Sequence, residues 1–360
     1  MAVTLKDIAE KAQVSISTVS RIINNDQTKP ASKETTDKVW KIVRELGYVP
    51  NLNARSLIKG QEEGEGDART KAIGCIFTST RDTYNDPFFS QIARGIQAEA
   101  AKRGYVMGYS FSSCDMNESA LYNNVTANRV DGAIVLGRFD QEFLAFLKNN
   151  IKNLVYAGLN YVNAGFDEII CDAYKAVASA IEHLIGLGHI NIGYIGSIPG
   201  TQKINVVNEH RFEAFQDTMR KHGIEVCEGF VRNIELCTEE GYKGMKELLK
   251  CSNRPSAVFA ANDVVAIGVM KAIHEEGLRI PEDIAVMGLD DIDIAAYLRP
   301  GLTTIHVPKE ELGKFAVKML IDRIENGHDL PVRVDLPFEL VVRESCGASK
   351  VNDEIPKNLG

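Results

Sequence analysis

From Ala72 onward the chain alternates short runs rich in β-branched and aromatic residues with longer segments of helical periodicity. Strands that alternate with helices build a parallel sheet with helices on both faces. Ten such strands are too many for one compact unit, so we expect a doubly wound α/β core of two lobes. The predicted strands are 72–78, 105–111, 132–136, 153–157, 168–171, 192–196, 230–233, 257–260, 284–289 and 302–306. The predicted helices include 88–103, 174–187, 209–222, 262–277 and 309–326.

The first 59 residues have a different character. Thr4 and Asp7 form a capping-box pattern ahead of a short helix that ends near Ala12. Ser15 can cap a second helix from Ile16 to about Asn24, and a third helix starts at Ser32. Two short helices joined by a tight turn are typical of a helix-turn-helix, which places its second helix in the major groove. The alternative is a three-helix domain that binds nothing.

The distribution of charge favours the DNA-binding alternative. The whole chain has 41 Lys and Arg against 49 Asp and Glu. Residues 1–59 nevertheless carry ten basic and six acidic side chains. A basic head on an acidic body is typical of a small domain that contacts nucleic acid while the rest has another task.

Residues 48–58 follow the third helix and contain Pro50, which prevents that helix from continuing. Asn51 can cap a new helix of about seven residues, a length that is unstable in water without a partner. Glycine and acidic residues then dominate 60–71, which predicts a linker.

Several classes of protein are excluded or disfavoured. No apolar run approaches the length of a membrane span, and the N-terminus lacks a signal-peptide pattern, so we expect a cytoplasmic protein without a membrane partner. The seven cysteines form no C-x-x-C pair, which predicts free thiols without structural zinc. The chain has no phosphate-binding loop, nucleophile elbow or zinc-hydrolase motif. We therefore expect no catalytic residue, no metal and no cofactor.

The N-terminal segments resemble the lactose/galactose repressor family. The matching segments are Thr4-Leu5-Lys6-Asp7-Ile8-Ala9, Val14-Ser15, Thr18-Val19-Ser20-Arg21-Ile22-Ile23-Asn24, Tyr48-Val49-Pro50-Asn51 and Ala54-Arg55-Ser56-Leu57. The body matches at Asp86-Pro87-Phe88-Phe89, Asp131-Gly132, Leu187-Gly188-His189, Ile192-Gly193-Tyr194-Ile195-Gly196, Arg211-Phe212, Ala261-Asn262-Asp263, Ile280-Pro281-Glu282-Asp283-Ile284, Leu289-Asp290-Asp291 and Leu302-Thr303-Thr304-Ile305. The resemblance covers the chain to about residue 345. It implies a transcription regulator, a repressor, whose core is similar to periplasmic sugar-binding proteins.

The resemblance also implies which residues contact a double-stranded, pseudo-palindromic DNA operator. Ile16, Ser17 and Arg21 match base-reading positions. Leu57 matches a leucine that wedges into the central base step of the minor groove when two hinge helices, here about 51–58, pair. The full set is Thr4, Ser15, Ile16, Ser17, Thr18, Ser20, Arg21, Asn24, Asn51, Ala54, Arg55 and Leu57. One departure is Gln13, where the family usually has glycine in the turn.

A small effector is expected between the two lobes of the core. The family's contact positions correspond to Phe88, Phe89, Asn160, Arg211, Leu236, Asn262 and Asp290. From the residues alone, Asn262 can instead cap the helix that follows it, and the two phenylalanines can belong to the core. Leu236 stands where the family often has a stacking aromatic, which disfavours a purine and favours a mono- or disaccharide. Tyr84, Phe88 or Tyr297 could supply a stacking surface instead.

The expected organisation is a DNA-binding domain (1–59), a linker (60–71), a core (72–346) and a tail (347–360). Within the core we expect an N-lobe from 72–172 and 304–331 and a C-lobe from 173–303 and 332–346. Paired hinge helices require a homodimer, and the tail has too few heptad leucines for a tetramer helix. Two alternatives stay open: a carbohydrate-binding protein without a DNA role, and a regulator controlled by a protein corepressor.

Overall fold

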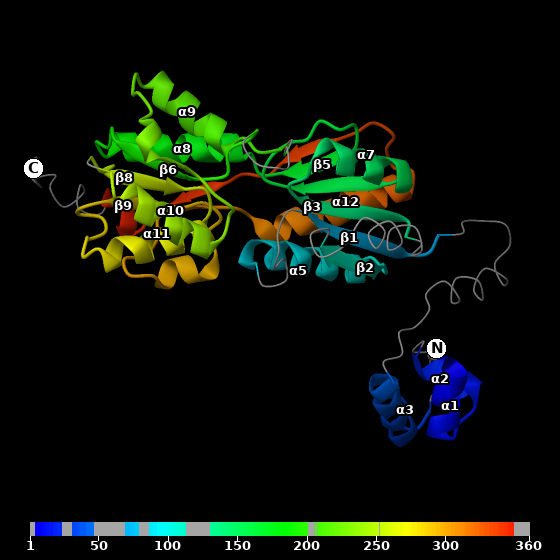
Figure 1. The fold of residues 1–360 in the computed structure, drawn as a ribbon. Coiled ribbons are helices and arrows are strands. Elements are labelled where there is room, and N and C mark those ends of the chain that lie inside the picture. The colour runs from blue at the N-terminus through cyan, green and yellow to red at the C-terminus, as the bar shows by residue number, and fades with distance from the viewer. Residues whose placement is uncertain are drawn as a thin grey trace, which may run out of the picture. The chain divides into compact units, whose positions relative to one another are not determined.

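The computed structural model describes residues 4–23, 31–46, 69–78, 86–112, 130–200, 206, 208–251 and 253–348. The chain divides into two units, Met1–Thr70 and Lys71–Gly360, and each is considered by itself (Figure 1). Several predicted features lie outside the described residues: Asn24, the hinge helix at 51–58, the linker as far as residue 68, and the tail from 349 onward.

Within its described residues, the N-terminal unit consists of three helices: α1 (Leu5–Ala12), α2 (Ile16–Ile23) and α3 (Lys33–Leu46). They share one small apolar core, formed by Ile8, Ala9, Ala12, Val19, Val39 and Ile42. The capping box of α1 is confirmed, since the backbone N–H of Thr4 donates to Asp7 Oδ2 at 2.7 Å and the N–H of Asp7 donates to Thr4 Oγ1 at 3.4 Å. Gln13 ends α1 in the left-handed conformation with φ 57°, which is strained for a residue that carries a Cβ.

The N-lobe of the core is built on a parallel sheet, described with six strands in the order β11-β5-β4-β3-β1-β2. The strands are β1 (Ala72–Thr78), β2 (Val106–Ser112), β3 (Gly132–Gly137), β4 (Leu154–Gly158), β5 (Asp167–Ile170) and β11 (Arg333–Asp335). Helices α5 (Pro87–Lys102) and α12 (Lys309–Ile324) lie side by side on one face, and α7 (Gln141–Asn150) covers the other (Figure 1).

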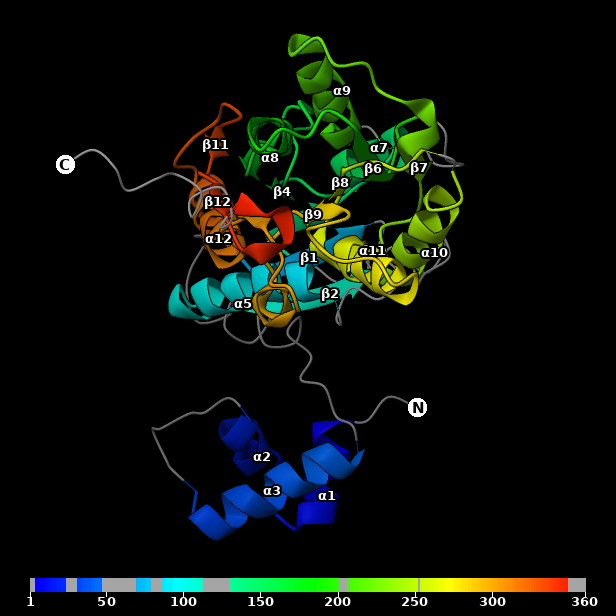
Figure 2. The ribbon, with the colours of Figure 1, turned by 90° about the vertical axis from the view of Figure 1, so that its left-hand side faces the viewer.

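The C-lobe repeats this plan on a smaller parallel sheet in the order β7-β6-β8-β9. The strands are β6 (Ile192–Gly196), β7 (Val231–Asn233), β8 (Ala257–Ala260) and β9 (Ala285–Met287). Figure 2 shows α8 (Ala173–Gly186) and α9 (Arg211–Lys221) on one side of this sheet and α10 (Thr238–Leu248) and α11 (Asp263–Glu275) on the other. Short 3-10 turns are η2 (Glu228–Phe230) and η3 (Asp293–Tyr297). The doubly wound, two-lobed core is therefore as predicted.

One predicted lobe boundary is wrong. We expected 332–346 in the C-lobe, but β11 pairs with β5 and extends the N-lobe sheet. The chain then forms β12 (Glu339–Val341), which pairs antiparallel with β10 (Thr304–His306), and reaches the C-lobe at η4 (Glu344–Cys346), which packs on β9. The return to the C-lobe therefore follows Asp335. The predicted strand 302–306 belongs to this two-stranded ribbon and not to either main sheet.

Among the helices that the structure describes, none combines the length and the apolar content that crossing a lipid bilayer requires.

Candidate DNA-binding surface and ligand site

The start of α2 presents hydroxyl groups and a guanidinium on one surface. Ser15 caps the helix, because its Oγ accepts a 3.1 Å hydrogen bond from the N–H of Thr18. Ser17 is exposed, with its Oγ 2.8 Å from that of Ser15, and Ile16 is 48% exposed. The Nε of Arg21 donates to the carbonyl of Ser17 at 3.2 Å, which holds the guanidinium along the same surface. A helix N-terminus with such groups suits phosphate oxygens and guanine edges.

The other predicted DNA contacts divide into two groups. Thr4 is exposed but its side chain is engaged in the capping box of α1, and Thr18 and Ser20 are half-buried residues of α2. The remaining ones lie outside the described residues, namely Asn24, Asn51, Ala54, Arg55 and Leu57.

The predicted effector residues lie where strands end or helices begin. Phe88 is in the first turn of α5 and Asn160 follows β4, both in the N-lobe. Arg211 begins α9, Asn262 caps α11 and Asp290 follows β9, all in the C-lobe. Each of these five residues is at most 9% exposed. In this arrangement of the lobes, their side chains are thus almost completely shielded from solvent.

Arg211 is held by bonds to two neighbours. Its Nε donates to Oε1 of Glu209 at 2.8 Å, its Nη2 donates to Oε2, and its Nη1 donates to the carbonyl of Ala261 at 2.9 Å. Burial opposes the charged form, but the carboxylate of Glu209 outweighs it and raises the pKa of Arg211. A guanidinium has five N–H groups, so donors remain for a ligand.

Asn262 has the structural role that the sequence offered as an alternative. Its Oδ1 accepts a 3.0 Å hydrogen bond from the N–H of Val265 and caps α11. The side chain is 9% exposed and follows Ala261, whose carbonyl binds Arg211. Capping and ligand contact are compatible because the amide nitrogen is a separate group.

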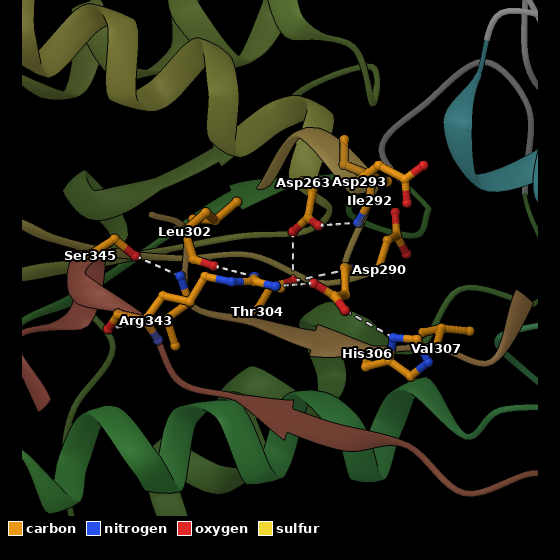
Figure 3. A network of polar contacts seen from close by, with 12 residues as sticks. Asp263, Asp290, Ile292, Asp293, Leu302, Thr304, His306, Val307, Arg343 and Ser345 are labelled. Atoms are coloured by element: carbon orange, nitrogen blue, oxygen red, sulfur yellow. Dashed lines mark hydrogen bonds and ion pairs between the residues drawn. The ribbon is translucent and has the colours of Figure 1, made fainter. Parts of the chain in front are cut away.

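Asp290 has an unusual backbone and an unsatisfied carboxylate. Its φ is 126°, a region that residues with a Cβ rarely adopt. The buried Oδ1 has no hydrogen-bond partner among the described residues. Burial raises the pKa of Asp290, and the nearby Asp263 raises it further. A buried acceptor without a partner at the lobe junction is suited to a ligand hydroxyl (Figure 3).

Two further acidic residues surround Asp290. Asp263 accepts hydrogen bonds from Thr304 Oγ1 at 2.6 Å and from the N–H of Ile292 at 2.9 Å. Asp291 accepts from Arg343 Nη2 at 2.7 Å and lies 2.9 Å from Nδ1 of His306. Figure 3 shows how this network ties the loop after β9 to β10 and to the segment before η4.

The apolar predictions have mixed outcomes. Phe89 is partly buried and packs edge-on against Phe77 and Phe88, with ring centroids 6.2 and 5.2 Å apart. Leu236 packs partly buried against the apolar clusters of the C-lobe. Of the suggested stacking residues, Tyr297 is 80% exposed on η3 and Tyr84 lies outside the described residues.

Sequence reasoning missed the polar residues directly before Arg211. Asn208 and Glu209 are buried in the C-lobe and contact residues of the N-lobe. The only signal in the sequence was the polar run Asn208-Glu209-His210 before a helix start.

Two surface hollows lie away from these residues. One, of ≈ 400 Å³, is lined by Ile267, Met270, Lys271, His274, Glu275, Leu298 and Arg299. The other, of ≈ 430 Å³, is lined by residues of α7 and of the 162–164 loop. Over the described ranges, no three His, Cys, Asp or Glu side chains are grouped as a metal ion would require.

Comparison with known proteins covers both units. Residues 4–51 match the family model described as bacterial regulatory proteins, lacI family, and 181–346 match a periplasmic binding protein-like domain. The HTH-type transcriptional repressor PurR of Escherichia coli O1:K1 / APEC is 33% identical, over 97% of this chain and 98% of that protein. A CelR–cellobiose complex has a TM-score of 0.68 at 27% identity, covering 95% of this chain and 99% of that one. The Lac repressor dimer bound to operator and the anti-inducer ONPF has a TM-score of 0.69 at 27% identity, covering 96% and 99%.

Proposed function

The chain belongs to the lacI family of bacterial regulatory proteins and is a DNA-binding transcription repressor with an effector-binding core, and we propose that its effector is a mono- or disaccharide held between the lobes. We further propose that it binds a near-palindromic operator as a homodimer in the cytoplasm and catalyses no reaction. Its relatives are named as regulators and not as enzymes.

The start of α2 supports the DNA contacts. Ile16 and Ser17 are exposed there, and the Arg21 guanidinium lies on the same surface. In our proposal Ile16 meets a thymine methyl and Arg21 leaves the Ser17 carbonyl to make a bidentate contact with guanine.

The single observation that carries the effector proposal is the buried, unpartnered Oδ1 of Asp290. A hydroxyl group of a sugar can donate to it, whereas a purine would need a flat stacking partner, which Leu236 cannot provide. The charge of Arg211 is already balanced by Glu209, so the site does not require an anionic ligand. The related CelR structure is a complex with cellobiose, a neutral disaccharide, which supports the same class.

A thermal-shift screen tests the proposal. The full-length protein is heated with a panel of neutral mono- and disaccharides, and with hypoxanthine and guanine as the competing class. A ligand at about 100 times its Kd stabilises the folded state by roughly 2.7 kcal/mol, which moves Tm by several degrees. We expect a shift with at least one saccharide and none with the purines.

Asp290→Asn supplies the control for the location of the site. Replacing one carboxylate oxygen by an amide removes an acceptor at the lobe junction, so the Tm shift should disappear while operator binding persists. A purine shift without any saccharide shift would overturn the effector class. An unchanged shift in Asp290→Asn would remove this residue from the site. If no small molecule shifts Tm, the regulator controlled by a protein corepressor replaces this proposal.

A further inference from the structure

The segment immediately before α9 joins the two lobes. Asn208, Glu209 and His210 belong to the C-lobe, and each contacts a different residue of the N-lobe. We call these three residues the lobe latch. The next residue is Arg211, which the proposed function places against the effector.

Asn208 makes the most buried contacts of the latch. Its Nδ2 donates to the carbonyl of Gly137 at 3.0 Å and to the hydroxyl of Tyr156 at 3.1 Å. Its Oδ1 accepts from the N–H of Phe139 at 3.3 Å. Gly137 has φ 96°, and a Cβ there would lie 2.2 Å from the carbonyl oxygen of Thr78, so this turn at the end of β3 requires glycine. One side-chain amide thus satisfies three polar groups of the opposite lobe.

Glu209 carries the charge of the latch. Its side chain is fully buried between two guanidiniums, Arg138 of the N-lobe with Nη1 at 3.3 Å and Arg211 of its own lobe. The N–H of Arg211 also donates to it at 3.2 Å. Burial by itself would raise the pKa of Glu209, but the charge and hydrogen bonds of Arg211, with those of Arg138, lower it to about 2. The carboxylate is therefore ionised at any physiological pH.

His210 completes the junction. Its ring stacks on Tyr161 of the N-lobe with centroids 5.0 Å apart and planes inclined by 25°. The guanidinium of Arg333, from β11, lies 5.3 Å from the same tyrosine ring. The latch therefore contacts the loops after β3 and after β4.

We propose that Glu209 is a positioning residue that couples the effector site to lobe closure: one carboxylate orients Arg211 and binds Arg138 of the opposite lobe. When the lobes separate, the Arg138 bond breaks and the Arg211 bond stays, because only the first crosses the junction. A ligand that contacts Arg211 thus acts on the group that also holds the lobes together. This inference rests on the proposed function only in placing the effector at Arg211.

The test measures the distance between the lobes without any ligand. The full chain receives p-acetylphenylalanine at Asn149, the exposed second-to-last residue of α7, and at Lys250, exposed just after α10. A donor and an acceptor dye are attached, and excess unlabelled protein suppresses transfer between subunits. Single-molecule energy transfer then reports how the lobes are distributed between closed and open arrangements.

Four variants are compared with the unsubstituted chain. Glu209→Gln removes the carboxylate that the Arg138 and Arg211 guanidiniums share across the junction, so the low-transfer population should grow several-fold. The double variant Glu209→Gln/Arg138→Gln also lacks the repulsion between the Arg138 and Arg211 guanidiniums across the junction. It should therefore regain part of the closed population, a rescue that a general loss of stability would not give. Arg138→Gln alone should open the lobes to an intermediate degree. Glu182→Gln, which breaks a half-exposed pair with Lys221 within the C-lobe, should change nothing.

The outcomes separate this inference from the proposed function. A Glu209→Gln protein with native circular dichroism and an unchanged distance distribution overturns the inference. If Glu209→Gln does not fold, Arg138→Gln alone decides, and an unchanged distribution in that variant overturns it equally. Failure of the saccharide screen would leave these distances unaffected and would overturn only the effector class.

Discussion

Oγ1 of Thr304, the first residue of β10, donates a 2.6 Å hydrogen bond to Oδ1 of Asp263, the first residue of α11 (Figure 3). The Asp263 carboxyl group is completely buried. Burial raises its pKa, the hydrogen bonds from Thr304 and Ile292 reverse only part of that increase, and the resulting pKa is about 6. The ribbon at the lobe junction is thus attached to a carboxyl group that titrates near neutral pH.

Asp263 should make the core less stable as the pH rises. The unfolded chain ionises this group near 3.8 and the folded chain near 6, so the folded state holds the extra proton between these values. The protonated Asp263 carboxyl group therefore stabilises the folded state fully below about pH 4. This stabilisation falls between pH 4 and pH 6 and is lost above pH 6. The total is at most roughly 3 kcal/mol for a difference of this size.

Urea unfolding followed by circular dichroism at about pH 4.5 and pH 7 checks this prediction. Asp263→Asn should reduce the pH dependence, with the remainder coming from the raised pKa of buried Asp290, whereas Asp335→Asn, at an exposed position in β11, should retain all of it. Equal slopes for the unsubstituted protein and Asp263→Asn would contradict the pKa assignment. The free energy of unfolding of each variant at pH 4.5 is compared with the value for the same variant at pH 7. A pH-independent loss of stability caused by the missing acceptor therefore does not affect the result.

The alternation of strands and helices could be predicted because central strands of the core, such as β1, β3, β4 and β6, are short, fully buried runs with a clear start and end. Strands β11 and β12 were missed for a physical reason. Each is three residues long and carries exposed or half-exposed side chains, so backbone pairing with β5 and β10, not an apolar pattern, defines them. The same strands explain why the predicted lobe boundary at residue 332 was wrong.

The candidate site could be predicted only in part. Asp290 and Asn262 were recognisable as polar residues at a strand end and a helix start. The role of Glu209 was not, because it depends on Arg138, which is 71 residues away in the chain and lies in the other lobe. Contacts that close a junction between lobes follow from tertiary structure, and one sequence contains no local signal for them.

Arg21 should determine which operator sequence the protein reads. Arg21→Ala removes a bidentate donor to guanine, so binding to a selected operator should weaken by roughly 1–3 kcal/mol. Binding to unrelated DNA should fall much less, since phosphate contacts dominate there. Fluorescence anisotropy on both DNAs measures the difference, with Lys6→Ala as a control that removes one exposed positive charge outside α2. An equal loss on the two DNAs would exclude base reading by Arg21.

Leu57 should act as the minor-groove wedge, although it lies outside the described residues. A hydrophobic wedge unstacks a base step and bends the duplex, and by the family pattern the step is a central CG. Leu57→Ala should reduce operator affinity and the bend measured by gel mobility, and it should leave the saccharide-induced Tm shift unchanged. A normal bend in this variant would refute the assignment. Leu52→Ala, in the same short segment, provides the matched control.

The assembly should be a homodimer whose tail plays no part. Paired hinge helices require two chains, and a two-fold protein requires a near-palindromic site. We expect no coiled coil from the last residues, because the sequence has Pro356 and too few apolar residues after Ala348 for the three to four heptads that a coiled coil needs. A truncation that tests the tail has to leave η4 intact. Ser345 and Cys346 are buried there, and Ser345 Oγ donates to the carbonyl of Val286 at 2.6 Å. Loss of these contacts would destabilise the C-lobe. Removing 349–360 avoids this problem. Light scattering at micromolar concentration should give twice the chain mass before and after that truncation, whereas a tetramer that becomes a dimer on truncation would show that the tail holds the assembly together.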